Sequence, residues 1–86
     1  MEALPRASMP TYDLTDQALA YALRRLRKMS GSTQEDLAFR AGITAAALAR
    51  IERGNANPRW TTVRRIISAL EVSLAELVAA VEEAPL

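Results

Sequence analysis

The sequence lacks the residue types on which most catalytic and metal sites depend. Its 86 residues include neither cysteine nor histidine. Without cysteine the chain can form no disulfide framework and no thiolate zinc site. Without histidine it also lacks the commonest general base and the commonest metal ligand. We therefore expect no metal, no cofactor and no enzymatic activity.

Aromatic residues and long apolar runs are scarce as well. No apolar run approaches the roughly 18 residues of a membrane span, and no signal-peptide pattern opens the chain. Aromatic residues make up only 5% of the sequence, while 50% of it is apolar, mostly leucine, alanine, isoleucine and valine. This mixture favours helices over strands. We expect one small helical domain in the cytoplasm, with no membrane partner.

Positive and negative charges nearly balance, but they are unevenly distributed. The net charge is only +1. Residues 24–65 carry ten Arg or Lys against three Asp or Glu, whereas residues 66–86 carry four Glu and no basic residue. A basic middle followed by an acidic end is typical of a nucleic-acid-binding face with a separate association surface. A solvated basic face would give the same pattern, so charge alone does not decide between the two.

Proline, glycine and capping residues divide the chain into five expected helices. Residues 1–15 show no period and predict a flexible arm. Residues 16–83 are expected to form the domain, and residues 84–86 a short tail. The last helix is expected to begin at a capping box made by Ser73 and Glu76.

Residues 34–53 are predicted to form a helix-turn-helix. Thr33 and Thr44 are good helix caps, and Gly42 suits the left-handed turn between the two helices. Small and apolar residues at the crossing let the first helix brace the second against a groove of DNA. The residues expected to form this shared core are Leu37, Ala38, Ala41, Ile43, Leu48 and Ile51.

Four segments of the chain carry a resemblance to a known family. They read LRRLRK at 23–28, TQEDLA at 33–38, RIERG at 50–54 and VSLAEL at 72–77. In this order they resemble the Cro/repressor (XRE-like) helix-turn-helix family, over most of the chain. The resemblance implies an all-α, compact five-helix domain of the lambda-repressor type. It also implies a DNA-binding transcriptional regulator whose partner is double-stranded DNA.

The helix that begins near Thr44 is, by this resemblance, the one that enters the major groove. Arg50 stands at a base-reading position, and an Arg fork is the commonest specific partner of guanine O6 and N7. A phosphate contact or a surface ion pair is the alternative role of Arg50. The chain departs from the family at Ala45, Ala46 and Ala47, because alanine can contact a thymine methyl but cannot hydrogen bond to a base.

Other positions take structural or backbone-binding roles from the same resemblance. Arg27 and Glu52 are expected to form a structural salt bridge, and Trp60 to lie in the core. Arg59 is placed to reach a narrow minor groove, although each loop residue could instead be merely solvated. The residues expected near the DNA backbone are Gln34, Thr44, Arg53, Asn55, Asn57 and Arg59, with Arg24, Lys28 and Arg40 as phosphate neighbours.

The acidic last helix is expected to mediate association. Leu74, Val78 and Val81 recur at helical spacing, and they would form a two-fold interface if they are not all needed by the core. A homodimer would place two recognition helices one helical turn, ~34 Å, apart on DNA. An adaptor that binds another protein, or an antitoxin, on the same scaffold is the alternative function, since the alanine-rich helix is poorly equipped to read bases.

Overall fold

Five helices make up the fold of residues 16–85, which are the residues that the computed structural model describes. The expected arm of residues 1–15 lies outside them. No other regular structure is present in the described part of the chain, and the all-α prediction is confirmed. None of these helices is long and apolar enough to cross a bilayer. The helices are α1 (Asp16–Ser30), α2 (Gln34–Ala41), α3 (Ala45–Glu52), α4 (Trp60–Leu70) and α5 (Leu74–Glu82).

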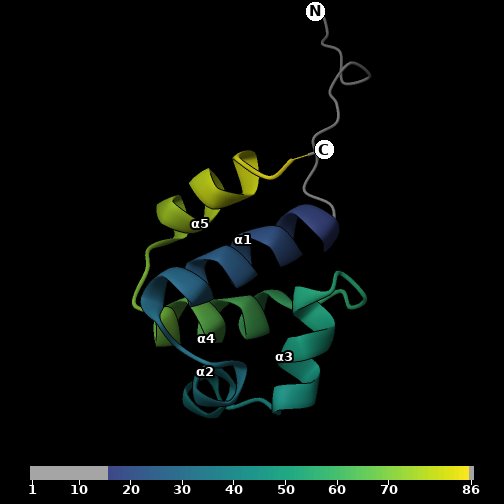
Figure 1. The fold of residues 1–86 in the computed structure, drawn as a ribbon, viewed down its shortest axis with the longest axis vertical. Coiled ribbons are helices and arrows are strands. Elements are labelled where there is room, and N and C mark those ends of the chain that lie inside the picture. The colour runs from purple at the N-terminus through teal and green to yellow at the C-terminus, as the bar shows by residue number, and fades with distance from the viewer. Residues whose placement is uncertain (1–15, 86) are drawn as a thin grey trace, which may run out of the picture.

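Helix α1 runs through the middle of the molecule (Figure 1). It packs against α5 on one side and against α3 and α4 on the other, while α2 packs against α3 and α4. Each helix contributes a buried side chain to the common core: Leu23, Leu37, Leu48, Ile66 and Leu77, in chain order. The core therefore holds α2 and α3 at the end of the molecule away from α5.

The helix starts are fixed by the side chains that the sequence predicts. The backbone N–H of Asp36 donates to the hydroxyl of Thr33 at 3.0 Å, at the start of α2. At the start of α5, the Ser73 N–H donates to the Glu76 carboxylate at 2.7 Å and the Glu76 N–H donates to the Ser73 hydroxyl at 3.0 Å. The predicted capping box is thus confirmed, and it satisfies N–H groups that have no partner within the helix.

Trp60 corrects one expectation. It was predicted to lie in the core, but 54% of it is exposed, whereas Val63 and Ile67 on the same side of α4 are buried. Trp60 is the first residue of α4, so it lies at the end of the helix, past the buried layer. Its ring lines an open hollow between α2 and α4.

Gly42 gives the most direct test of the turn between α2 and α3. It adopts φ 76°, and an added Cβ would meet no atom within 4 Å. The substitution Gly42→Ala should therefore cost about 1–2 kcal/mol of stability through backbone strain alone. Urea unfolding would measure the loss. Gly42→Asn should lose less stability, because Asn enters the left-handed region more easily. Equal stability of the wild type and both variants would contradict a left-handed turn at Gly42.

Candidate nucleic-acid interface

The turn that joins α2 to α3 sets the direction in which α3 leaves. Gly42 ends α2 in a left-handed conformation, and the N–H of Ile43 donates to the Ala38 carbonyl at 3.0 Å. Ile43 packs against the core from this corner. The next residue, Thr44, caps α3, because its hydroxyl accepts from the Ala47 N–H at 3.0 Å. The start of α3 is therefore fixed by both backbone and side-chain contacts.

Helix α3 buries one face and leaves the other open. Leu48 and Ile51 are buried in the core. Ala46, Arg50 and Arg53 are exposed, and their spacing of four and three residues places them on one outward face. Ala45 and Ala47 are half-buried on its flanks. The outward face therefore offers two arginine side chains on a smooth alanine surface.

A buried carboxylate holds α3 to α1 and α2. Glu52 is only 2% exposed. Arg27 of α1 donates to its two oxygens, from Nε at 2.7 Å and from Nη2 at 2.8 Å, and Gln34 of α2 donates at 3.0 Å. The hydrogen bonds to Glu52 raise the pKa of the Arg27 guanidinium, against a lowering by partial burial. We call these three residues the Glu52 node.

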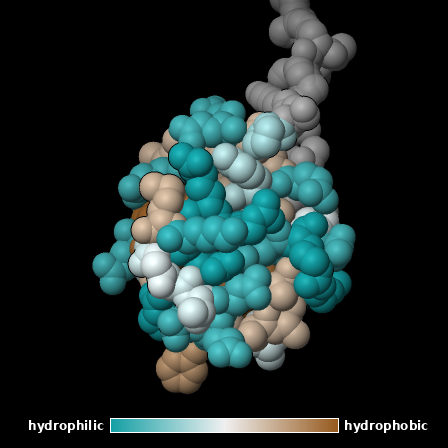
Figure 2. Space-filling view, viewed as in Figure 1, coloured by the Kyte–Doolittle hydropathy of each residue, from teal (hydrophilic) through white to brown (hydrophobic). Residues whose placement is uncertain are grey.

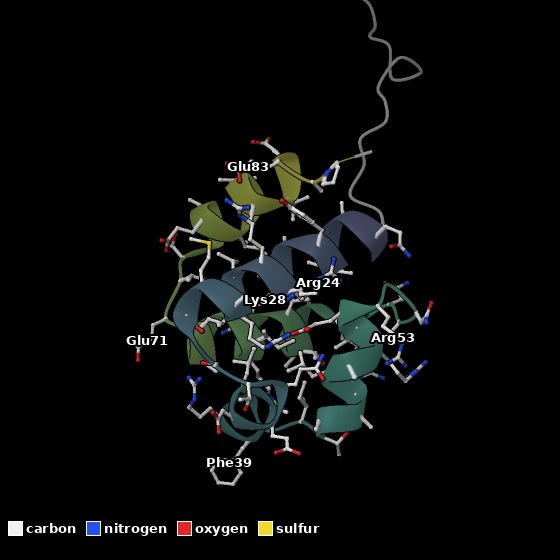
Figure 3. All side chains as sticks on the ribbon, viewed as in Figure 1. Arg24, Lys28, Phe39, Arg53, Glu71 and Glu83 are labelled. Atoms are coloured by element: carbon white, nitrogen blue, oxygen red, sulfur yellow. The ribbon has the colours of Figure 1, made fainter. Side chains whose placement is uncertain are left out.

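The same end of α3 is also bound through its backbone. Arg24 of α1 donates from Nη1 to the Glu52 carbonyl oxygen at 2.7 Å. A cation is favourable at this position, because the last carbonyls of a helix are unpaired and carry partial negative charge. Arg24 was expected near phosphate, yet its guanidinium is used within the protein. Figure 3 shows it on α1, facing the end of α3.

Two further residues also make contacts that the sequence did not predict. Gln34 was expected near the DNA backbone, and the structure shows that its amide donates to the Glu52 carboxylate at 3.0 Å. Arg40, another expected phosphate neighbour, donates to the Ala69 carbonyl and to the Ser32 hydroxyl. Hydrogen bonds of this kind depend on how separate helices meet, so spacing along the chain carries no signal for them.

The loop after α3 stays close to the end of that helix. The Asn55 N–H donates to the Arg50 carbonyl at 3.0 Å, and the Arg50 side chain reaches the Asn55 carbonyl at a long 3.3 Å. Asn55, Asn57 and Arg59 are exposed. Arg53 points outward beside this loop (Figure 3). The structure thus brings Arg50, Arg53 and the loop residues together at one side of the molecule.

The exposed charge along α3 and the following loop is positive. Across residues 16–85, no three Asp or Glu side chains gather in a way that could hold a metal ion. The charged groups that are exposed along α3 and the following loop are arginines. Such a surface can attract anions and donate hydrogen bonds to them.

Comparison with known proteins assigns the family. The family described as "Helix-turn-helix domain" matches residues 18–80. The chain is 41% identical over 61 residues to the uncharacterized HTH-type transcriptional regulator y4dJ of Sinorhizobium fredii (strain NBRC 101917 / NGR234), covering 71% of this chain and 79% of that protein. The chain belongs to the helix-turn-helix domain family, and the resemblance carried by its four sequence segments is confirmed.

Two other similar proteins are informative. The crystal structure of the restriction-modification controller protein C.AhdI from Aeromonas hydrophila is similar with a TM-score of 0.70 and 31% identity, covering 72% of this chain and 94% of that one. Antitoxin HipB of Escherichia coli (strain K12) is 36% identical over 56 residues, covering 65% of this chain and 64% of that protein. The five-helix fold is therefore shared with a known controller protein.

The Glu52 node gives a clear stability prediction. Glu52→Ala should lower the free energy of unfolding by about 3–5 kcal/mol, because it leaves the mostly buried charge of Arg27 without its partner. Denaturant unfolding followed by circular dichroism would measure the loss.

The matched control is the exposed pair of Arg25 and Glu83, which lie 3.8 Å apart with about half of each side chain in solvent. Glu83→Ala should change stability by less than about 1 kcal/mol. Similar losses in the two variants would show that the node does not hold the helices together.

Proposed function

We propose that the chain regulates transcription by docking α3 in the major groove of double-stranded DNA. Membership of the helix-turn-helix family makes it a DNA-binding regulator and not an enzyme. The observation that carries the docking mode is the outward face of α3, on which Arg50 and Arg53 stand beside the loop that holds Arg59. The protein would act in the cytoplasm, where a bacterial operator is reached directly.

The proposed contacts divide into two kinds. Arg50 reads a guanine, while Ala45, Ala46 and Ala47 lie against base edges and contact thymine methyls only. Thr44, Arg53, Asn55 and Asn57 face the backbone, and Arg59 reaches towards the minor groove. Gln34 helps to position α3, because its amide donates to Glu52 at the end of that helix. Direct base reading therefore depends mostly on a single side chain.

Arg50→Ala should weaken binding to the preferred duplex by about 1–3 kcal/mol and relax the preference at one base pair. The cause is loss of the bidentate contact with guanine. Fluorescence anisotropy with the preferred duplex, isolated from a random pool, and its single-base variants would measure both effects. An equal loss of affinity for every duplex would show that Arg50 contacts phosphate and does not read a base.

Arg53→Ala is the matched comparison, since it removes an exposed arginine from the same helix end. It should weaken binding to all duplexes alike and lower the slope of log affinity against log salt by about one. An unchanged slope of log affinity against log salt would show that Arg53 does not contact the DNA backbone.

The dimer is proposed to form through α5. Leu74 and Val78 are 48% and 47% exposed, and Val81 is half-buried, whereas Leu77 and Ala80 face the core. The first three therefore form an apolar stripe beside the buried face of the helix. A second copy related by two-fold symmetry could cover the same stripe on both chains.

Val78→Asp should dissociate this dimer, because the two-fold axis brings the new charges together on an apolar surface. Sedimentation velocity at matched concentrations would measure the mass. Ala79→Asp, one residue further along α5 and also exposed, should leave the dimer intact. A wild-type monomer, or a Val78→Asp dimer, would contradict the assignment.

An antitoxin role is the second candidate, and the similarity to antitoxin HipB favours it. Such a role requires a surface that binds a second protein. Binding to random-sequence duplex at low and moderate salt separates a regulator from a pure adaptor. A pure adaptor would bind no duplex or would show no sequence preference.

A further inference from the structure

An open hollow of about 1160 Å³ lies between α2 and α4, apart from the outward face of α3. We call it the α2–α4 groove. Arg50, Arg53 and the loop residues of the proposed DNA interface do not line it. The side chains that give it its character are Phe39, Arg40, Trp60, Arg64, Arg65 and Leu74.

Large apolar side chains gather at this groove. Five large apolar side chains are exposed in the described part of the chain, and Phe39, Trp60 and Leu74 are among them. Phe39 is 86% exposed, and Figure 3 shows its ring projecting from α2 at the edge of the molecule. Figure 2 shows a mostly hydrophilic surface over α1, and a brown ring projects at the α2 end. Single exposed apolar residues are ordinary, but a cluster in a concave surface marks an interaction site.

The groove carries charge of one sign. Its lining includes three arginines and no Asp or Glu. Arg40 is held by the Ala69 carbonyl and the Ser32 hydroxyl. Arg64 and Arg65 are exposed on α4, and neither forms an ion pair with any of residues 16–85. Trp and Arg side chains dominate the binding energy of protein interfaces.

We propose that the α2–α4 groove docks an acidic segment of a partner protein that carries a large apolar side chain. The apolar side chain packs between Phe39 and Trp60, and the carboxylates pair with Arg64 and Arg65. Duplex DNA would satisfy the arginines but has no flexible apolar side chain to bury against the two aromatic rings. Of the three residues of the α5 stripe, Leu74 is the one that also lines the groove.

Selection from a phage-displayed library of short random peptides tests the proposal with the intact chain. Peptides enriched on the wild-type protein should combine Asp or Glu with Phe, Trp or Leu. Synthetic copies of them should bind at least about tenfold more weakly to Phe39→Ala and to the double variant Arg64→Glu, Arg65→Glu. All three positions are exposed, so these substitutions leave the core intact.

Matched controls come from α1. Met29 is 70% exposed and Lys28 is also exposed, and neither lines the groove. Met29→Ala and Lys28→Glu should therefore bind the selected peptides as the wild-type protein does. Circular dichroism and thermal unfolding would show that every variant is folded.

Several results would overturn the proposal. One is a selection with no enrichment, or with enriched peptides that lack acidic residues or bind the groove variants as well as the wild type. Another is a loss of dimer mass in Phe39→Ala, which would make a second copy the occupant. Weaker binding of random-sequence duplex by Phe39→Ala would make DNA the occupant.

Discussion

The rest of the structure depends on one buried carboxylate. Glu52 lies at the end of α3, where Arg27 of α1 and Gln34 of α2 donate to its side chain and Arg24 of α1 donates to its carbonyl oxygen. An unpaired carboxylate at this depth would be very costly, because burial removes its water. The three helices must therefore meet in one arrangement that brings all of these donors to Glu52. These donors and the buried side chains of Leu48 and Ile51 together hold α3 in its orientation.

That orientation explains how the surface divides. With Leu48, Ile51 and Glu52 turned inward, the exposed positions of α3 are Ala46 and Arg50, and the exposed Arg53 follows the helix directly. The charged residues of the node are hydrogen-bonded inside the protein, whereas Arg50 and Arg53 are exposed and Arg50 makes one long bond to the Asn55 carbonyl. The α2–α4 groove is lined by none of the exposed arginines of the α3 region, whereas it shares Leu74 with the apolar stripe of α5. DNA and a partner protein therefore need not compete for one surface.

Much of this could be predicted from the sequence, because capping residues, glycines and helical spacing are local signals. The caps at Thr33, Thr44 and Ser73 and the inward residues of α3 are of this kind. The pairing of Arg27 with Glu52 was implied only by family resemblance, and the structure brings the two together. The bonds of Arg24 and Gln34 to Glu52 join residues 28 and 18 positions apart, and no local pattern encodes them. Trp60 was misplaced because periodicity indicates a face of a helix but not where the covering layer ends.

The most direct measurement is the change in backbone amide chemical shifts when a short random-sequence duplex is added at low salt. If the Glu52 node presents α3 to DNA, the changes should concentrate between Thr44 and Arg59. The amide chemical shifts of Leu74–Glu82 in α5, and of the aromatic residues Phe39 and Tyr21, should change little. Changes centred on α5 or on the α2–α4 groove, with the α3 face unaffected, would contradict this mode of DNA binding.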